Sequence, residues 1–379
     1  MRTSGRATIC GIAVTLAGVL AGCSTSGGTS SSTSTSPSSA NSGHVSSPAL
    51  IGTLKQQAGK ETGLVIYANA PTQYFQPVIA AFNKLYPQIH VSVTTLSDNT
   101  VFSKYEAEAA QGARTADLLV ASAPASWVQA EQNGVTANIT PAGLSAFPSW
   151  VSQGHGVYVM SAEPILLAYS PKLLTPAQVP ATWAQLAADA KANPARYKMV
   201  SYPVTNPLDY AGIYGLIHIL GAGQVWNYYD ALAPVTKTYD EGLTQLSVVL
   251  QGGASIGYMS SGLAQGVLPH YKGLAAYKFM RDATPLIPRG IAVTAKAASP
   301  ASAQLFLDFL YSQAGQNALC AAGFEAAMNN FHSSTGCTAS LTALQTQVPP
   351  NTTYLVPISQ AVLSQQSAIT QRWDRAFHR

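Results

Sequence analysis

Short runs of apolar residues alternate with longer segments in which apolar residues recur every three or four positions. Leu64-Val65-Ile66-Tyr67 is such a short run and predicts a buried strand. Tyr86-Pro87 ends a predicted helix, because a residue before proline disfavours the helical conformation. Between them, after a loop at 68–71, helical spacing is kept by Phe75, Val78, Ile79, Phe82 and Leu85. The pattern therefore predicts a strand, a loop and a helix in succession.

The same succession follows twice more. Residues 89–93 alternate as a strand, and Asp98 or Asn99 can cap a helix that ends at Gly112. A third strand at 117–121 leads into another helix. Strand–loop–helix units in series indicate a parallel sheet with helices on its faces.

The second half of the chain continues the pattern. Asn206 caps a predicted helix that has Pro207 at its first position and Gly221 at its end. Around this helix, strands are predicted at 156–160, 164–169, 197–201 and 255–259, and helices at 182–192, 224–232 and 239–250. The predicted fold class is α/β, with two lobes in sequence and a final return of the chain to the first lobe.

The chain begins with the features of an export signal. Two arginines precede an apolar run at 11–20 that is too short to span a bilayer. The run ends at Leu20-Ala21-Gly22-Cys23, which resembles the bacterial lipobox, in which the signal is removed and the cysteine sulfur is acylated. Acyl chains would anchor Cys23 to the bacterial cell membrane, outside the cytoplasm. The alternative is an ordinary signal peptide with a cysteine at this position by chance.

The predicted organisation has five parts. Residues 1–22 form the signal peptide. Residues 23–49 form a disordered stalk starting at the lipidated Cys23, because their Ser- and Thr-rich composition cannot bury enough apolar surface to fold. Lobe 1 comprises 50–162 and the returning segment 288–345, lobe 2 comprises 163–287, and a helical segment at 346–379 ends the chain.

Charge and cysteine content exclude some classes of function. Of 20 basic residues 18 remain after removal of the signal, against 16 acidic ones, and the absence of a basic run argues against nucleic-acid binding. Cys10 would leave with the signal, so Cys320 and Cys337 remain to form a disulfide in an oxidising compartment. Neither has a partner at metal-ligand spacing, and we expect no metal site and no cofactor.

Several short motifs in a fixed order resemble those of a known family. They are Leu64-Val65-Ile66-Tyr67 with Phe82-Asn83-Lys84-Leu85-Tyr86-Pro87, then Ala116-Asp117-Leu118-Leu119-Val120, Glu163-Pro164-Ile165-Leu166-Leu167-Ala168-Tyr169-Ser170-Pro171, Val179-Pro180-Ala181-Thr182-Trp183-Ala184-Gln185-Leu186 and Ser299-Pro300-Ala301-Ser302-Ala303-Gln304-Leu305-Phe306-Leu307-Asp308-Phe309-Leu310. From about Gly63 to Phe324 the chain resembles extracellular solute-binding proteins of ABC importers, which have the two-lobed type II periplasmic-binding fold. It is most similar to the group that binds ferric iron, thiamine, polyamines and aminoethylphosphonate.

The resemblance implies a hinge, lobes that close over a small-molecule solute, an ABC permease in the membrane as partner, a monomer and no enzymatic activity. It places the chain crossings near 162–169 and 285–293, and the ligand cleft where strands end and helices begin. Loops at the carboxyl ends of parallel strands converge there. The residues expected to contact the ligand are Asn69, Ala70, Ser122, Ala123, Tyr202, Thr205, Asn206, Asp209, Tyr210, Tyr258, Ser260 and Ser261. The alternative is that many of them are only caps and turns.

The expected ligand is a small organic solute rather than bare ferric iron. The resemblance implies that iron-binding members use adjacent tyrosines after the strand at 255–259, a His in the first loop and a Glu after the third strand. This chain has Ser260-Ser261, Ala70-Pro71 and Ser122-Ala123 there, and none of these is a hard anionic donor. The pair Tyr228-Tyr229 lies in a predicted helix and is assigned to packing. An iron(III)-binding protein of the same family is the alternative function.

Asp209 adds a condition on ligand charge. In the first turn of its helix, the Asp209 carboxylate would repel a phosphate or sulfate and favour a neutral or amine-bearing ligand. The aromatic contacts to such a ligand would come from Tyr202, Tyr210 and Tyr258. The alternative is that Asp209 only caps the helix.

A different class, a lipid-anchored serine esterase, is suggested by Gly253-Ala254-Ser255-Ile256-Gly257, which matches the G-x-S-x-G nucleophile elbow. Asp282 or Asp308 with His332 would complete a triad. An elbow serine follows a strand and opens a helix, whereas Ser255 follows a predicted helix and opens a strand, so we take the match as chance. A purely structural surface lipoprotein is a third class, and ligand-dependent closure would distinguish it from a binding protein.

Overall fold

The computed structural model describes residues 48–261, 264–271 and 273–378. The predicted signal peptide (1–22), Cys23 and all of the predicted stalk except its last two residues lie outside the described residues. All of these described residues belong to one compact unit. None of the helices that the structure describes is both long enough and apolar enough to cross a membrane.

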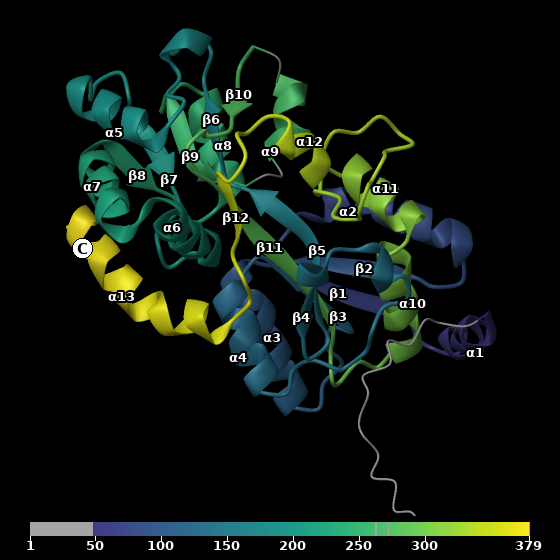
Figure 1. The fold of residues 1–379 in the computed structure, drawn as a ribbon. Coiled ribbons are helices and arrows are strands. Elements are labelled where there is room, and N and C mark those ends of the chain that lie inside the picture. Colours follow the sequence, from purple (N-terminus) through teal and green to yellow (C-terminus); the bar gives the residue numbers. More distant parts are fainter. Residues whose placement is uncertain (1–47, 262–263, 272, 379) are drawn as a thin grey trace, which may run out of the picture. The chain divides into compact units, whose positions relative to one another are not determined.

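The larger of two sheets draws its strands from distant parts of the chain (Figure 1). Strand β1 (Leu64–Ala68) lies between β2 (Val91–Thr95) and β3 (Leu118–Ala121), and all three are parallel, which confirms the prediction from the strand–loop–helix series. The seven-stranded sheet is completed by β11 (Thr284–Val293) antiparallel to β3, then β5 (Val157–Pro164) and β4 (Ser152–Gly154), with β12 (Thr353–Leu355) paired to the start of β11.

Two layers of helices cover this sheet. One layer consists of α1 (Pro48–Ala58), α2 (Thr72–Leu85), α10 (Pro300–Leu310) and α11 (Gln313–Ala321), and the other of α3 (Asp98–Ala110) and α4 (Pro124–Gln132). Leu118 and Val120 of β3 pack in the core with the first layer, whereas Leu119 and Ala121 pack with the second. Successive side chains of a strand point to opposite faces, so β3 is buried on both sides. We call this sheet and its helices lobe 1.

The smaller sheet has five strands and forms lobe 2. Its order is β10 (Ala276–Lys278), β6 (Leu166–Tyr169), β9 (Ile256–Ser260), β7 (Met199–Ser201) and β8 (Thr236–Thr238), with β7 parallel to both β8 and β9. Around it pack α5 (Trp183–Ala192), α6 (Pro207–Leu220), α7 (Ala222–Leu232) and α8 (Gly242–Leu250). Short helices complete the described chain: α9 (Ala264–Val267), α12 (Leu341–Gln345) and 3₁₀ turns at Leu144–Ala146, Ser149–Val151, Pro176–Gln178, Ala233–Val235 and Leu268–Tyr271.

Helix α6 has the ends that its sequence predicts. Asn206 Oδ1 accepts a hydrogen bond from the Leu208 backbone N–H at 3.0 Å, and Pro207 is the first helical residue. Gly221, at a positive φ of 84°, ends the helix. Because these signals act within one turn, they are readable without knowledge of the fold.

Other boundaries differ from the prediction. Helix α8 begins at Gly242 rather than at residue 239, because the Tyr239 N–H donates to Ser201 O at 2.9 Å and so continues the pairing of β8 with β7. Neither Asp98 nor Asn99 caps α3, since Ser97 occupies the cap position and Asp98 is already helical and buried. The expected second chain crossing at 285–293 lies within β11, which belongs entirely to the larger sheet, so the chain changes sheets before Thr284.

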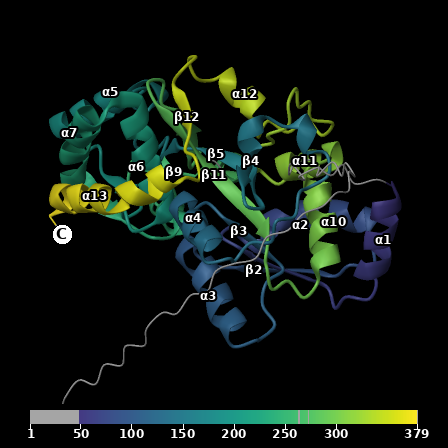
Figure 2. The same ribbon diagram turned by 60° about the horizontal axis from the view of Figure 1, so that its bottom comes forward.

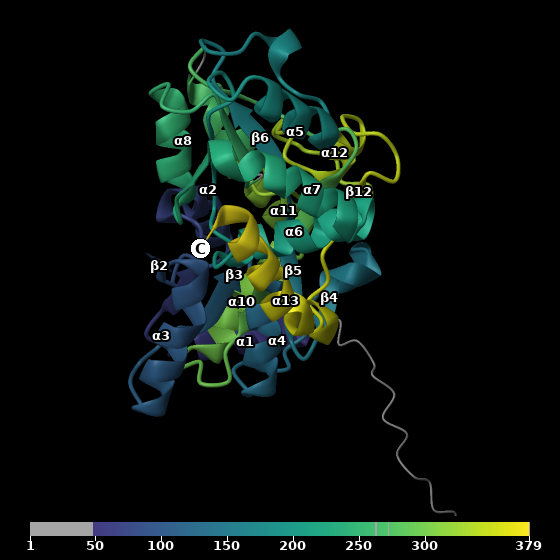
Figure 3. The same ribbon diagram turned by 90° about the vertical axis from the view of Figure 1, so that its left-hand side faces the viewer.

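The C-terminal helix α13 (Gln360–Phe377) lies across both lobes (Figures 2 and 3). It contacts α4 of lobe 1 and both α6 and α7 of lobe 2. Its apolar face buries Trp373 in the core of lobe 2, and the Tyr210 hydroxyl donates a hydrogen bond to Val362 O. Arg372 forms an ion pair with Asp230 of α7 at 2.6 Å. The predicted C-terminal helical segment is therefore packed against the fold rather than projecting from it.

Candidate functional site

A cavity of about 290 Å³ lies between the two lobes. Lobe 1 lines it with residues that follow β1 and β2, and lobe 2 with residues that follow β7 and β9. The lining from lobe 1 is Asn69, Pro71, Tyr74, Thr95, Leu96, Ser97, Asp98 and Arg289. The lining from lobe 2 includes Ala168, Tyr202, Asn206, Leu208, Asp240, Glu241, Gly242, Leu243, Ser260 and Ser261. The cavity thus lies where the carboxyl ends of parallel strands converge.

Five of the twelve residues expected to contact a ligand line this cavity: Asn69, Tyr202, Asn206, Ser260 and Ser261. The two serines follow β9, and Tyr202 follows β7. Both positions were expected from the family resemblance together with the strand ends that precede them. The other seven residues do not line the cavity: Ala70, Ser122, Ala123, Thr205, Asp209, Tyr210 and Tyr258.

Tyr210 and Tyr258 face the interior of lobe 2 rather than the cavity. Tyr258 is fully buried in β9, and its hydroxyl donates to Thr236 Oγ1 at 3.2 Å. Tyr210 donates to the C-terminal helix. Burial raises the pKa of both phenols, so both hydroxyls stay protonated. Neither is placed to act as the aromatic contact that the sequence analysis assigned to it.

Asp209 is also turned away from the cavity. It is fully buried, its Oδ1 accepts from Ser201 Oγ at 3.4 Å, and its Oδ2 has no hydrogen-bond partner. Burial raises the Asp209 pKa well above its usual range. The backbone of this helix end is capped by Asn206 instead. Asp209 therefore does not contact a ligand in the cavity, and it does not cap helix α6. Both roles were predicted as alternatives from the sequence.

Three of the expected residues in the loops after β1, β3 and β7, namely Ala70, Ser122 and Thr205, support the site without lining the cavity, as does Ala123. Ser122 is fully buried, and its backbone N–H donates to Asp98 Oδ1 at 2.8 Å. Ala70 and Ala123 are buried in the lobe 1 core. Thr205 is exposed, and its carbonyl accepts a hydrogen bond from Asn99 Nδ2 of lobe 1 at 3.3 Å. That bond joins the two lobes beside the cavity.

A buried charged network on the lobe 1 side was not predicted from the sequence. Arg289 of β11 forms an ion pair with Glu163 of β5 and donates to Asn69 Oδ1, and Asn69 Nδ2 donates to Asp98 Oδ1 at 2.7 Å. The register between β11 and β5 shifts at Arg289/Gly290, and such bulges re-aim a side chain. An arginine inside an otherwise apolar strand is the signal that could have revealed this network.

Asp98 is the member of this network with a shifted titration. Burial raises the pKa of Asp98 to about 6, although the hydrogen bond from Asn69 and the charge of Arg289 act in the opposite direction. The pKa of Tyr202, across the cavity, is raised by burial and by the nearby carboxylates of Asp98 and Glu163. The site therefore carries a carboxyl group that changes charge just below neutral pH.

Two further hydrogen bonds connect the lobes beside the cavity. Ser261 Oγ of lobe 2 donates to Glu163, and Gln265 Nε2 of α9 donates to Glu325 Oε1 at 2.6 Å. Glu325 is buried, and burial together with the neighbouring Glu163 raises its pKa well above the usual range. The structure thus shows the lobes joined over the cavity by side chains from both.

Residues 68–317 match the family model of bacterial extracellular solute-binding proteins. The chain belongs to this family. Its members are solute-binding components of ABC transporters that act outside the cytoplasm, and they are not enzymes. No curated protein sequence matches this solute-binding protein.

Solved structures of the same fold agree with this assignment. The substrate-binding protein of an ABC transporter from Agrobacterium tumefaciens is 20% identical, with a TM-score of 0.75 over 84% of this chain and 94% of that one. Iron-bound HitA from Pseudomonas aeruginosa is 18% identical, with a TM-score of 0.66 over 83% and 99%. MotA from A. tumefaciens B6, in complex with glucopine, is 17% identical, with a TM-score of 0.64 over 83% and 100%. At these identities the similarity shows the fold alone.

The residues of the esterase alternative serve the fold of this solute-binding protein. Ser255 Oγ donates to Lys198 O at 3.0 Å just before β9, so Ser255 does not open a helix. Asp282 accepts from the Trp183 N–H, and Asp308 accepts from the Ala142 N–H at 2.7 Å. His332 lies in the loop after α11 of lobe 1, whereas Ser255 lies in lobe 2.

The candidate metal ligands and the tyrosine pair are dispersed in the structure or serve packing. Within residues 48–261, 264–271 and 273–378, no three His, Cys, Asp or Glu side chains gather closely enough to hold a metal ion. Tyr229 of α7 is buried in the lobe 2 core next to Tyr258, at 6.3 Å between ring centroids. The Tyr228-Tyr229 pair thus belongs to a packed helix and does not line the cavity.

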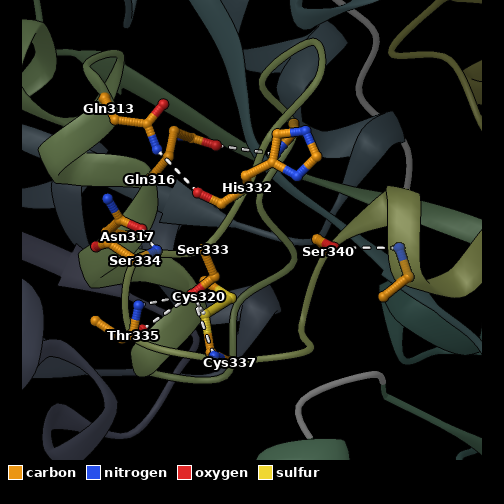
Figure 4. The surroundings of a disulfide bond; sticks show 12 residues. Gln313, Gln316, Asn317, Cys320, His332, Ser333, Ser334, Thr335, Cys337 and Ser340 are labelled. Carbon is orange, nitrogen blue, oxygen red and sulfur yellow. Dashed lines mark hydrogen bonds between the residues drawn. A yellow bond between two sulfur atoms is a disulfide. The ribbon is translucent and has the colours of Figure 1, made fainter.

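The disulfide between Cys320 and Cys337 is present, which confirms the prediction (Figure 4). It joins the end of α11 to the following loop, with 5.9 Å between the Cα atoms. Ser333 Oγ accepts from the Cys337 N–H at 3.1 Å, and Asn317 Oδ1 accepts from the Ser334 N–H at 2.9 Å. The loop after α11 is therefore held to lobe 1 by covalent and hydrogen bonds together.

Proposed function

We propose that this protein is a lipid-anchored solute-binding protein that captures a small organic solute at the bacterial cell surface and delivers it to an ABC permease. The observation that carries the ligand class is the charge around the cavity. Three carboxylates line it, those of Asp98, Asp240 and Glu241, and the one cation in the described lining is Arg289. Because Arg289 is already paired with the buried Glu163, the remaining charge of the side chains that line the cavity is negative.

An amine-bearing solute fits this surplus of carboxylates. Asp240 and Glu241 are exposed at the start of α8, where an ammonium group could reach them. Tyr74 and Tyr202 border the cavity from opposite lobes, and aromatic faces attract cations. Asn69, Asn206, Ser260 and Ser261 supply neutral hydrogen bonds. A phosphate or sulfate would be repelled by the same carboxylates.

Ferric iron fits less well. Ser260-Ser261 stands where the family resemblance implies a tyrosine pair, and a serine hydroxyl is a poor substitute for a phenolate on a hard cation. HitA is an iron-bound relative, whereas MotA binds glucopine, so the fold itself does not select between iron and an organic solute. Selection must come from the cavity lining, and here that lining favours an organic amine.

The ligand proposal is tested by native mass spectrometry of protein purified from its own host, followed by a thermal-shift screen. We expect a bound organic mass, a rise in Tm with small amines, and no rise with ferric citrate in the presence or absence of carbonate. Ferric binding with a tyrosinate charge-transfer colour would overturn the proposal in favour of an iron(III)-binding protein. A single species of monomer mass is expected in the same spectra.

The lipid anchor is a separate part of the proposal and has its own test. Cys23→Ala should release the protein from the membrane fraction or leave its precursor uncleaved, because the cysteine sulfur is the site of acylation. Cys10→Ala, inside the predicted signal, is the matched control and should stay membrane-bound. Normal processing and anchoring of Cys23→Ala would contradict a lipoprotein.

A further inference from the structure

A second cavity, of about 680 Å³, adjoins the first. Tyr74 of α2 and Leu243 of α8 line both, so these two side chains form the boundary between an inner and an outer cavity. The outer cavity is walled on the lobe 1 side by Gln73, Ala321 and the Cys320–Cys337 disulfide. On the lobe 2 side it is walled by Gln265 and Tyr271.

The two cavities differ in charge. Four charged side chains line the inner cavity, whereas no described residue that lines the outer cavity is charged. Two of the four large apolar side chains that are exposed in the described chain border the outer cavity: Leu243, 53% exposed, and Tyr271, 38% exposed. An apolar group placed there would cover both of them.

The small size of the inner cavity also favours a ligand that extends into the outer cavity. At about 290 Å³ it lies just below the range of roughly 300–1,000 Å³ that is usual for ligand pockets. A solute larger than a small amine would extend past Tyr74 and Leu243, where the adjoining space is uncharged.

On the basis of the proposed function, we infer that the solute has two parts. A protonated amine occupies the inner cavity against Asp98, Asp240 and Glu241. An uncharged extension, apolar where it meets Leu243 and Tyr271, passes between Tyr74 and Leu243 into the outer cavity, beside the disulfide. Lobe closure then buries both parts, because each cavity has walls from both lobes.

The probes for this inference are butylamine and octylamine, which share an ammonium group and differ only in chain length. Each buried methylene is worth up to about fourfold in affinity. We expect octylamine to bind at least tenfold more tightly than butylamine, measured as Kd by isothermal titration calorimetry with the full folded protein.

Ala321→Trp separates the two cavities experimentally. Ala321 is exposed at the end of α11 and lines only the outer cavity, so an indole there occupies part of that cavity without disturbing the core. We expect the gain of octylamine over butylamine to become smaller and the Kd of butylamine to stay unchanged. The matched control is Ala195→Trp, at an exposed position of lobe 2 that lines neither cavity, and it should keep the full gain.

The outcomes distinguish this inference from the proposed function. Butylamine binding without any gain from octylamine, or an equal gain in Ala321→Trp and Ala195→Trp, overturns the two-part site and leaves a small amine binder. If neither amine binds, the inference of a two-part amine solute is wrong. The proposed function is then still tested separately, by the organic mass retained in protein purified from its host. Leu243→Ser, at an exposed position, should reduce the octylamine gain partially and serves as a second variant that preserves the fold.

Discussion

The two walls of the inner cavity are built differently. On the lobe 1 wall, Arg289, Glu163, Asp98 and Asn69 hold one another in a buried network. On the lobe 2 wall, Asp240, Glu241 and Leu243 are exposed at the start of α8. The charged groups of lobe 1 are therefore held in place by one another, whereas Asp240 and Glu241 of lobe 2 remain open to solvent. The difference teaches that charge at this cavity is fixed by long-range pairing on one wall and by exposure at a helix start on the other.

The largest expected effect comes from breaking the lobe 1 network. Arg289→Met removes one partner of a buried ion pair and leaves Glu163 without its counter-charge, which should lower the free energy of unfolding by about 3–5 kcal/mol. Urea unfolding at pH 7.5 measures this loss. Asp240→Asn, on the exposed wall of lobe 2, is the control and should change it by less than about 0.5 kcal/mol. Equal losses in the two variants would mean that the walls do not differ in this way.

The disulfide should stabilise lobe 1 selectively. Its cysteines are 17 residues apart, and closing a loop of this length is worth about 3 kcal/mol by the chain-entropy estimate. The double variant Cys320→Ala/Cys337→Ala should lose about that amount. By hydrogen exchange, α11 and the loop after it should open faster while α5 to α8 of lobe 2 stay protected. Faster exchange throughout lobe 2 would refute a local role.

The charge of Asp98 should make amine binding depend on pH. Burial raises the Asp98 pKa to about 6, so the folded protein binds an extra proton between the ordinary aspartate pKa and pH 6, and the stability that Asp98 contributes falls as pH rises through this window. An ammonium group binds the ionised Asp98 carboxylate more tightly than the protonated carboxyl group. Butylamine affinity should therefore fall as pH drops below about 6, by up to tenfold per pH unit.

Butylamine titration of two variants at several pH values tests whether this pH dependence comes from the lobe 1 wall of the inner cavity. Asp98→Asn should bind butylamine weakly at pH 7.5 and show no loss between pH 7.5 and 5. Asp240→Asn should also bind weakly but keep the wild-type slope. A slope that survives in Asp98→Asn would place the titrating group elsewhere. Calorimetric titration at each pH gives the Kd values.

The smallest expected effect concerns Asn206, which links helix capping to the lobe 2 wall. Asn206 Oδ1 caps α6, and its Nδ2 donates to Asp240 Oδ1 at 3.0 Å. Asn206→Ala should cost about 1 kcal/mol of stability and weaken butylamine binding severalfold. Asn206→Ser keeps a capping oxygen, so it should retain stability but still weaken binding. If Asn206→Ser binds as tightly as the wild type, Asp240 does not depend on Asn206 for its position.

Local signals made much of the fold predictable from sequence. The strand at β1, the helix that follows it and the capped helix α6 are specified by periodicity and by Asn206, Pro207 and Gly221, all of which act within a turn or a strand. Tyr202, Ser260 and Ser261 could be assigned to the cavity because strand ends are readable and parallel strands end together.

Side-chain direction and long-range pairing could not be read in this way. Asp209 and Asn206 lie three residues apart, yet only Asn206 reaches the cavity, because packing of α6 against lobe 2 turns Asp209 inward. Glu163 and Arg289 meet only because β5 and β11 become neighbours in one sheet.

The sequence by itself therefore determined the α/β class, the succession of strands and helices in the first part of the chain, the disulfide partners and the family. The tertiary structure alone decided which charges face the solute, that α13 joins both lobes, and that a second, uncharged cavity adjoins the first. The physical reason is range: propensity and capping act over a few residues, whereas a binding wall is assembled from segments that come together only when the whole chain folds.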